Sequence, residues 1–493
     1  TAKFRPGDLK KAKYETNPLE DGSLDGYRLV EVDLEKLTHE TLKESPLDKR
    51  SKDRCKNMFA LGMLYWLYNR DIEPTLQALE DTFGAKKPDV AAANQQVVKA
   101  GYNYADITGL FQTSYVVGKA TDLPKGNYRN IMGNQALSLG LVAASKKAKL
   151  PIFLGSYPIT PASDILHQLS GYKNHGVITF QAEDEIAAVC AAIGAAYTGK
   201  IGVTTTSGPG LALKAEAVGL AVMTELPLVV INVQRSGPST GMPTKTEQAD
   251  LLQAMFGRNG ESPVPILAPT SPSDAFETAF EAVRIALEYM TPVILLSDGA
   301  IANGSEPWMI PNEADLKDIQ VNFLPPQAAE VETEEPFMPY RRNPETLARN
   351  WAIPGTKGLQ HRIGGIEKAD LTGNISYDPA NHEHMTMIRE NKVAGIANSL
   401  PDATTIGADH GDVLILGWGS TRGPITGAVK ALEAEGKKVS GCSLRHINPF
   451  PKNLGDLLKQ FKRVLIPEMN RGQLAMLIRS KYLVDAASYT RVQ

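Results

Sequence analysis

Acidic residues in one stretch of the sequence stand where a carboxyl group could take part in proton transfer. AEDEIAA (182–188) places Glu183, Asp184 and Glu185 directly before the run VCAAIGAAY. This run is small and apolar on nearly every side, so we expect a buried helix. Its most clearly apolar residues are Ile186, Val189, Cys190 and Ile193. A carboxylate at the end of a buried helix is costly unless it is paired or its raised pKa is used. Alternatively, the acids only complement the helix dipole, by about 0.3–1 kcal/mol each.

Two further loops combine a stiff backbone with hydroxyl or cationic side chains. In GSYPITPAS (155–163), two prolines restrict the backbone around Thr160. In VQRSGPSTGMPTKTEQ (233–248), Arg235 offers a planar fork that fits a carboxylate, and Thr244 offers a hydroxyl. A solvated surface arginine is the alternative for Arg235. The pattern favours a rigid site for a small anionic molecule.

Two glycine-containing turns remain ambiguous. TTTSGPG (204–210) is either a close approach of backbone to a ligand or a stiff helix N-terminus, and it is not a P-loop. GWGSTRG (417–423) differs by one residue from the dinucleotide fingerprint, and the next strand ends in SLRHINPF without an acid. We therefore favour a structural turn there. A nicotinamide-dependent dehydrogenase is the rival enzyme class that rests on this motif.

The candidate loops follow short β-branched runs that alternate with helical segments. These runs are PIFLG, VITFQ, IGVTTTS, PLVVINV and PVILLSD. The alternation predicts an α/β fold with a doubly wound parallel sheet. Such sheets bind ligands at the carboxyl ends of their strands. We expect the candidate residues to gather at that edge.

Length and composition limit the functions open to this chain. Its 493 residues are too many for one core. A net charge of −3 without a basic block argues against nucleic acid, and neither a membrane-spanning run nor a signal peptide is visible. Cys55, Cys190 and Cys442 cannot supply a four-cysteine cluster and suit a reducing cytoplasm. Because the sequence begins with Thr, we expect residues upstream to be missing.

Changes of sequence texture divide the chain into four parts. The first is α-rich, with helices predicted at 57–70, 73–84 and 93–105, and the third is rich in Pro and Glu. The predicted parts are an α-rich part at 1–118, an α/β domain at 119–311, a linker of irregular structure at 312–404, and a smaller α/β domain at 405–493.

Several motifs together resemble one enzyme family. They are GSYPITPASD, EDEIAAVCAAIGAAYTG, TTTSGPGLALKAEAVGLA, LVVINVQRSGPSTGMPTKTEQADL and LGWGSTRGPI. The sequence resembles 2-oxoacid:ferredoxin oxidoreductases, and in particular the fused γ–α chain of the 2-oxoglutarate type. The resemblance implies a thiamine-diphosphate pyrimidine-type domain at 119–311 and a transketolase C-terminal-like domain at 405–493. It also implies a partial γ domain at the N-terminus, with its glycine-rich half missing, and a shortened C-terminus.

The resemblance implies coenzyme A-dependent oxidative decarboxylation of 2-oxoglutarate to succinyl-CoA. Pyruvate and branched 2-oxoacids stay open as substrates, and a non-catalytic scaffold subunit is the alternative from another class. Thiamine enzymes commonly hold Mg²⁺ and the diphosphate with a GDG…N run, and SDGAIANG (297–304) is too short to be one. We therefore expect the coenzyme's tail, Mg²⁺ and a [4Fe–4S] cluster on a β subunit. That subunit would pass electrons to ferredoxin, in an (αβ)₂ assembly.

The resemblance also assigns roles to individual residues. Counted back from Gly194, the glutamate that contacts N1′ of the aminopyrimidine is Glu185, with Glu183 as the rival. Arg235 is implied to hold the substrate carboxylate, with Thr244 near the same group.

Thr160 is implied to lie beside the thiazolium and the 2-oxo group. The remaining implied residues are Ile159 for the substrate, and Tyr157, Pro158, Ser207 and Gly208 for the coenzyme. A distal carboxylate needs a second cation, for which Lys245 and Arg258, close together in the sequence, are the candidates.

Overall fold

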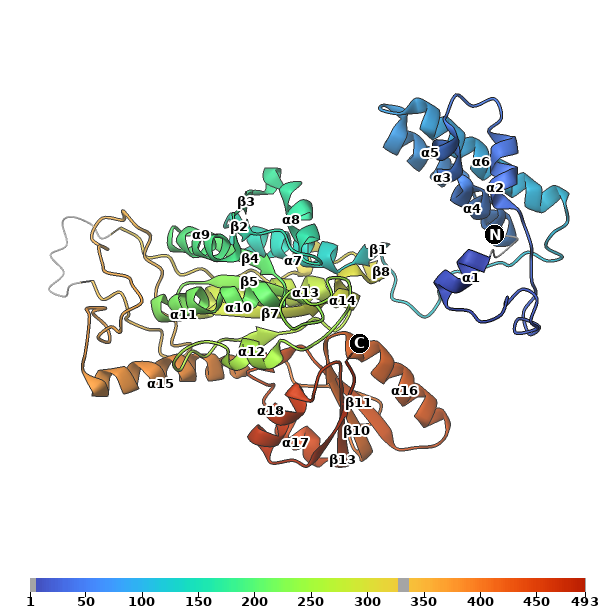
Figure 1. Ribbon diagram of the computed structural model, residues 1–493. Helices are drawn as coiled ribbons and strands as arrows, with labels where there is room; N and C mark the ends of the chain where they lie inside the picture. The colour runs from blue at the N-terminus through green and yellow to red at the C-terminus, as the bar shows by residue number, and fades with distance from the viewer. Residues whose placement is uncertain (1–5, 327–336, 493) are drawn as a thin grey trace. The chain divides into compact units, whose positions relative to one another are not determined.

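The chain folds into two units, each with its own hydrophobic core. The computed structural model describes residues 6–326 and 337–492 (Figure 1). The units are Thr1–Lys125 and Gly126–Gln493. The domain boundaries predicted at 118, 311 and 404 stay predictions.

The N-terminal unit is helical. Its helices are α1 (Pro6–Ala12), α2 (Leu34–Thr41), α3 (Lys49–Arg54), α4 (Lys56–Leu67), α5 (Glu73–Leu79) and α6 (Pro88–Ile107). α4 and α6 cross closely, because a Cβ at Gly62 would lie 2.1 Å from the Val98 carbonyl oxygen and one at Gly101 2.0 Å from that of Phe59. The three helices predicted here are present. However, α5 ends at Leu79 and a π-helical turn continues to Gly84.

The second unit is built on a seven-stranded sheet with helices on both faces (Figure 1). In spatial order the strands are β12 (His446–Asn448), β6 (Ile266–Leu267), β7 (Pro292–Asp298), β5 (Leu228–Gln234), β4 (Ile201–Thr206), β2 (Ile152–Ser156) and β3 (Val177–Gln181). All neighbours pair in parallel except β12 with β6. The predicted doubly wound sheet is confirmed.

Each face of this sheet has its own layer of helices. One core joins the sheet to α7 (Gly133–Ala148), α8 (Ser163–Ser170) and α13 (Asp274–Tyr289). The other core joins it to α9 (Glu185–Tyr197), α11 (Ala215–Thr224) and α12 (Leu251–Phe256). Two short helices begin after strand ends, namely α10 (Gly208–Leu213) and α14 (Gly299–Asn303).

A smaller five-stranded sheet completes the second unit. Its order is β14 (Ala486–Thr490), β13 (Phe461–Glu468), β10 (Gly411–Trp418), β11 (Val439–Leu444) and β9 (Thr405–Ile406). Its helices are α16 (Arg422–Ala434), α17 (Leu454–Lys459) and α18 (Gln473–Tyr482). Buried side chains of β10, β13 and α18 share a core with α9, α11 and α12, so the two sheets pack through one hydrophobic layer.

The GWGSTRG turn lies where the two sheets meet. Gln248 Nε2 donates to the Trp418 carbonyl oxygen at 2.9 Å, and the Ser420 backbone N–H donates to Asp298 Oδ2 at 3.3 Å. Gly419 has φ +59, and a Cβ there would lie 2.4 Å from Gln248 Nε2. These contacts support the structural interpretation of the motif over a dinucleotide site.

Several elements were not expected from the sequence. β1 (Tyr128–Met132) and β8 (Ser305–Met309) form a separate antiparallel pair. The region 312–404, predicted to be irregular, contains the 17-residue helix α15 (Pro379–Gly395). Its buried face includes Arg389 and Lys392 beside Met385 and Val393. Because cations occupy part of that face, the apolar periodicity that would have revealed the helix is absent.

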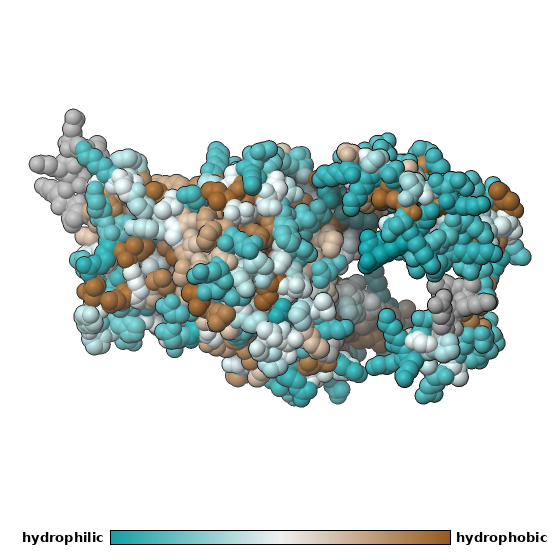
Figure 2. Space-filling view, turned by 45° about the horizontal axis from the view of Figure 1, so that its top comes forward, coloured by the Kyte–Doolittle hydropathy of each residue, from teal (hydrophilic) through white to brown (hydrophobic). Residues whose placement is uncertain are grey.

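The surface in view is mixed in character. Hydrophobic side chains form small groups between hydrophilic ones in the space-filling view (Figure 2). Within residues 6–326 and 337–492, none of the helices combines the length and the apolar character that crossing a membrane requires.

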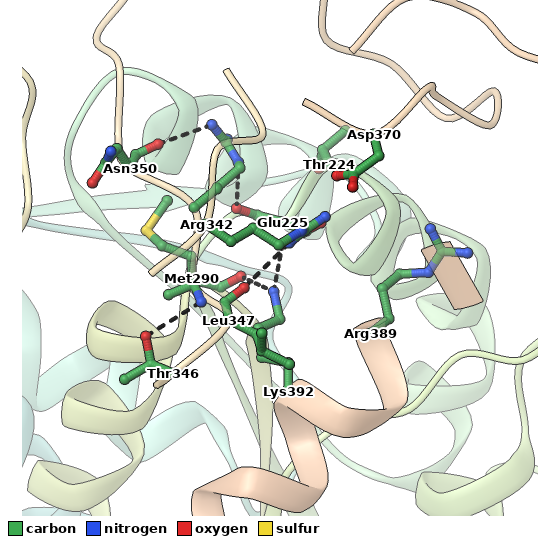
Figure 3. Close-up of polar contacts among 12 residues, drawn as sticks. Thr224, Glu225, Met290, Arg342, Thr346, Leu347, Asn350, Asp370, Arg389 and Lys392 are labelled. Carbon is green, nitrogen blue, oxygen red and sulfur yellow. Dashed lines mark hydrogen bonds and ion pairs between the residues drawn. The ribbon is translucent and has the colours of Figure 1, made fainter. Parts of the chain in front are cut away.

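A buried ion-pair cluster fixes the segment 340–392 to the large sheet (Figure 3). Glu225, 1% exposed, follows α11 and accepts hydrogen bonds from Arg342 at 2.5 and 2.6 Å and from Lys392 at 2.6 Å. Arg349 Nε donates to the Glu225 carbonyl oxygen at 3.2 Å. The ring of Tyr340, whose pKa burial raises to about 12, has Arg342, Arg349 and Lys368 within 5.8 Å of its centroid. The Glu225 carboxylate therefore holds two buried cations, Arg342 and Lys392.

Replacement of Glu225 by glutamine tests this cluster. Glu225→Gln is expected to destabilise the second unit by about 3–5 kcal/mol, because buried cations lose their counter-charge. Neighbouring cations lower the pKa of Glu225 below its ordinary 4.5. Its contribution is therefore complete above about pH 5 and declines as the pH falls further. Thermal unfolding between pH 4 and 8 measures both effects.

The matched control is Glu313→Gln, which removes an exposed ion pair with Lys146. This change should leave the unfolding midpoint as it is in the unaltered chain. Equal midpoints for both variants would contradict the role given to Glu225.

Candidate active site

The candidate loops lie at one edge of the large sheet. In the parallel registers, Ser156 pairs with Gln181 and with Thr205, and Thr206 pairs with Asn232. The carboxyl ends of β2, β3, β4 and β5 therefore lie side by side. The loops that follow these four strands carry the predicted site residues, as expected for a doubly wound sheet.

Glu185 is the first residue of α9 and is only 7% exposed, whereas Glu183 is exposed. Asp184 forms the N-cap, and its side chain accepts the Ala187 backbone N–H at 2.7 Å. A Cβ at Gly210 would lie 2.8 Å from Glu185 Cγ, so only glycine lets the two helix starts approach this closely. In the described part of the chain, no hydrogen bond reaches the Glu185 carboxylate, which is therefore a buried acid with free acceptor capacity.

The orientation of α9 differs in part from the expected one. A Cβ at Gly155 would lie 2.2 Å from the Ala188 carbonyl oxygen, so this side of α9 touches β2. Val189 and Ile193 are buried as expected, but Ile186 is 50% exposed and Cys190 is exposed. A helix that is apolar all round does not reveal which side faces its own sheet. The expectation of complete burial was therefore wrong for one side.

Arg235 joins two of the loops. It is 7% exposed, and its guanidinium donates to the carbonyl oxygens of Thr160 at 2.6 Å and Thr240 at 2.8 Å. Burial lowers its pKa. Nε is buried without a hydrogen-bond partner among the described residues. Arg235 thus fixes the loop after β2 to the loop after β5 and keeps N–H groups for a further acceptor.

The other predicted residues differ in exposure. Thr160, Thr244 and Pro158 are exposed, Tyr157 is 38% exposed and Ile159 is half-buried. Ser207 is fully buried, and its Oγ has no partner within residues 6–326 and 337–492. A Cβ at Gly208 would lie 2.8 Å from Asp250 Oδ2. The structure brings Arg235 and the Thr160 backbone into contact and leaves the exposed side chains available to a ligand.

The two candidate cations for a distal carboxylate are not equivalent. Arg258 uses its nitrogens on the carbonyl oxygens of Ala254, Met255 and Ser262, at 2.7–3.1 Å. Burial lowers its pKa to about 10. Arg258 therefore has a structural role, closing the turn after α12. Lys245 is exposed on the Arg235 loop and stays a candidate.

Sequence reasoning missed two buried charged residues here. Lys214 is fully buried, and its Nζ donates to the Glu185 carbonyl oxygen at 2.7 Å. Glu247 is 5% exposed and accepts the Gly237 backbone N–H at 3.2 Å. The available signal for Lys214 was a lysine within the run GLALKAEAVGLA, in which Glu216 is the only other charged residue.

Comparisons with known proteins agree with this architecture. The family model described as pyruvate flavodoxin/ferredoxin oxidoreductase, thiamine diphosphate-binding, matches residues 144–376. The model described as pyruvate ferredoxin/flavodoxin oxidoreductase matches residues 5–104. The fold and the first match define a thiamine-diphosphate-type α/β domain.

Relatives and a solved structure are more specific. The 2-oxoglutarate oxidoreductase subunit KorA of Mycobacterium tuberculosis is 55% identical over 99% of this chain and 74% of its own length. The 2-oxoglutarate synthase subunit KorA of Methanothermobacter marburgensis is 31% identical over 70% of this chain and 88% of its own. The structure of 2-oxoglutarate:ferredoxin oxidoreductase from Magnetococcus marinus, with 2-oxoglutarate, coenzyme A and succinyl-CoA bound, has a TM-score of 0.84 at 31% identity, over 99% of this chain and 84% of that one. The chain belongs to the 2-oxoacid:ferredoxin oxidoreductase family, which confirms the predicted resemblance.

The link through Arg235 predicts a measurable change in loop dynamics. Arg235→Ala removes the hydrogen bonds to Thr160 and Thr240, so both loops should open more often. Backbone amide hydrogen exchange at 157–163 and 237–244 is expected to accelerate about tenfold or more, while exchange within β5 stays constant. Lys245→Ala, in the same loop, is the control and should change neither segment. Unaltered exchange in Arg235→Ala would contradict the link.

Proposed function

We propose that this chain is the α subunit of a 2-oxoglutarate:ferredoxin oxidoreductase. With a β subunit, it would convert 2-oxoglutarate and coenzyme A to succinyl-CoA and CO₂, and the two electrons released would pass to ferredoxin. The names of the relatives and the bound molecules of the Magnetococcus structure support this substrate. The observation that carries the proposal is the largely buried Glu185 side chain at the sheet edge, whose carboxylate oxygens accept no hydrogen bond from the described residues.

The residues present fit the aminopyrimidine of thiamine diphosphate. A buried carboxyl that lacks a partner needs a donor or a basic nitrogen beside it, and N1′ of the ring is such a group. Gly210 lets the start of α10 lie directly against the Glu185 side chain, because a Cβ there would lie 2.8 Å from Glu185 Cγ. When bound, the coenzyme supplies a thiazolium carbon that adds to the 2-oxo group and accepts the electron pair left by CO₂. Glu185 would hold a proton between its carboxyl oxygen and N1′.

Arg235 and Thr160 would position the substrate. The unpaired Nε of Arg235 and the remaining N–H groups of its fork can donate to the carboxylate next to the 2-oxo group. The two loops that Arg235 joins include the predicted substrate residues Ile159, Thr160 and Thr244. A fixed loop matters because misplacement by about 1 Å can reduce the rate by about 10²-fold. Lys245 is the candidate cation for the distal carboxylate of 2-oxoglutarate.

A β subunit would complete the site. The three cysteines of the chain are too few for a [4Fe–4S] cluster held by four thiolates. Among the described residues, the one group of potential metal ligands is Glu35, His39 and Asp53, in the N-terminal unit and not at the sheet edge. We therefore place the cluster, Mg²⁺ and the coenzyme's diphosphate on the β subunit, in an (αβ)₂ assembly. The free cysteines support a reducing, cytoplasmic location.

The exposed side of α9 would contact this partner. Ile186, Cys190 and Gly194 lie four residues apart and face outward. A coenzyme whose ring lies at Glu185 and whose tail is held by another chain requires that chain beside the start of α9. The small, apolar side of the helix allows such an approach.

The Glu185 carboxyl is tested by an isosteric amide. Glu185→Gln should fold with an unaltered unfolding midpoint and lose about 10²–10⁴-fold in turnover, the range for a general acid–base group. The assay is coenzyme A-dependent reduction of a viologen dye by the αβ complex with 2-oxoglutarate. Glu183→Gln, at the exposed rival position, should keep its activity. The reverse result would move the assignment to Glu183.

Substrate identity is tested separately. The kcat/KM for 2-oxoglutarate should exceed that for pyruvate by about tenfold to a hundredfold, the value of one charge-assisted hydrogen bond to the distal carboxylate. The same viologen assay compares both acids. If pyruvate or a branched 2-oxoacid reacted equally well, the substrate would change and the reaction class would stand.

A further inference from the structure

Lys214 lies between α10 and α11 and has no exposed surface. Its Nζ donates to the main-chain carbonyl oxygen of Glu185 at 2.7 Å. Within the described chain this is the one hydrogen bond of the ammonium group, which can make three. A cation this deeply buried and so sparsely bonded is costly to the fold.

Local helix electrostatics act on Lys214 in opposite directions. Lys214 caps the N-terminus of α11, where the helix dipole disfavours positive charge, and the C-terminus of the short helix α10, where the dipole favours it. Burial lowers its pKa to about 8, and the charge that most opposes this shift is Glu185, followed by Asp184 and Cys190. Glu185 and Cys190 belong to α9 and Asp184 is its N-cap, and Glu216 of α11 lies near Cys190. The hydrogen bond and the nearest negative charges of the ammonium group both lie at the start of α9.

We propose that Lys214 is the positioning residue of Glu185, fixing the first turn of α9 through the Glu185 carbonyl and placing its positive charge near the Glu185 side chain. The ammonium charge would then lie near the negative charge that forms on Glu185 when a proton moves to N1′ of the aminopyrimidine. This inference rests on the proposed function. It assigns to Lys214 a charge effect exerted through Glu185, without contact to substrate or coenzyme.

Lys214→Met keeps the length and apolar stem of the side chain and removes its charge. In the αβ complex loaded with thiamine diphosphate, deuterium exchange at the thiazolium C2, followed by NMR after acid quench, should slow about tenfold to a hundredfold. The unfolding midpoint of the coenzyme-free complex should stay equal or rise, because an apolar group replaces a buried charge. A purely structural lysine would instead lower the midpoint.

Lys214→Gln is a second variant that keeps a donor without the charge. Exchange in the unaltered complex should fall as the pH rises above about 8, where Lys214 loses its proton. This alkaline decline should be absent from the glutamine variant. If the alkaline decline of C2 exchange persisted in Lys214→Gln, the proposed effect of the Lys214 charge would be overturned.

Lys368→Met is the matched control, since Lys368 is also buried and its Nζ donates to the carbonyl oxygens of Gly364 and Ile366. C2 exchange should not change in it. Normal exchange in Lys214→Met, or slow exchange with a lowered midpoint, would overturn the proposal. Glu185→Gln distinguishes a failure of the proposed function from a failure of the role given to Lys214. If C2 exchange is normal in Glu185→Gln as well, the proposed function fails. If exchange is slow in Glu185→Gln but normal in Lys214→Met, only the role of Lys214 fails.

Discussion

The burial of the Glu185 side chain is the constraint on which the rest of the site depends. A carboxylic acid that is only 7% exposed destabilises the fold unless a hydrogen-bond partner or a counter-charge compensates for its lost hydration. Glycines at 155 and 210 bring β2 and α10 against the start of α9. Lys214 binds its carbonyl from the side of the neighbouring helix. The sheet edge thus presents a carboxyl group with unused acceptors to whatever ring lies beside it.

Other buried charged residues near the site are also held by contacts with distant parts of the chain. α11 has Lys214 before its first turn and Glu225 after its last, each opposed to the helix dipole. Lys214 connects α11 to the active-site helix, and Glu225 connects it to the segment that carries Arg342. The Arg235 loop is anchored in turn at Gln248, whose side chain bonds to both Trp418 and Met469. The smaller sheet therefore helps to fix the loop that would hold the substrate.

Regular periodicity and local loop chemistry were readable from the sequence. The β-branched runs predicted the large parallel sheet. Because the carboxyl ends of its strands lie at one edge, they also predicted that Glu185, Thr160 and Arg235 lie near one another. Long-range contacts were not readable. The partners of Arg235 are backbone carbonyl oxygens, which carry no sequence signal, and α15 turns charged residues inward. The exposed side of α9 was equally hidden, because a helix apolar all round does not identify its partner.

The central claim is that Glu185 meets the aminopyrimidine of a coenzyme whose tail another polypeptide holds. The most direct measurement is a structure of the αβ complex with thiamine diphosphate bound. We expect a Glu185 carboxylate oxygen within about 3 Å of N1′ and the diphosphate on the β subunit. A Glu185 side chain turned to solvent, Glu183 at the ring, or a coenzyme held within one chain would contradict it.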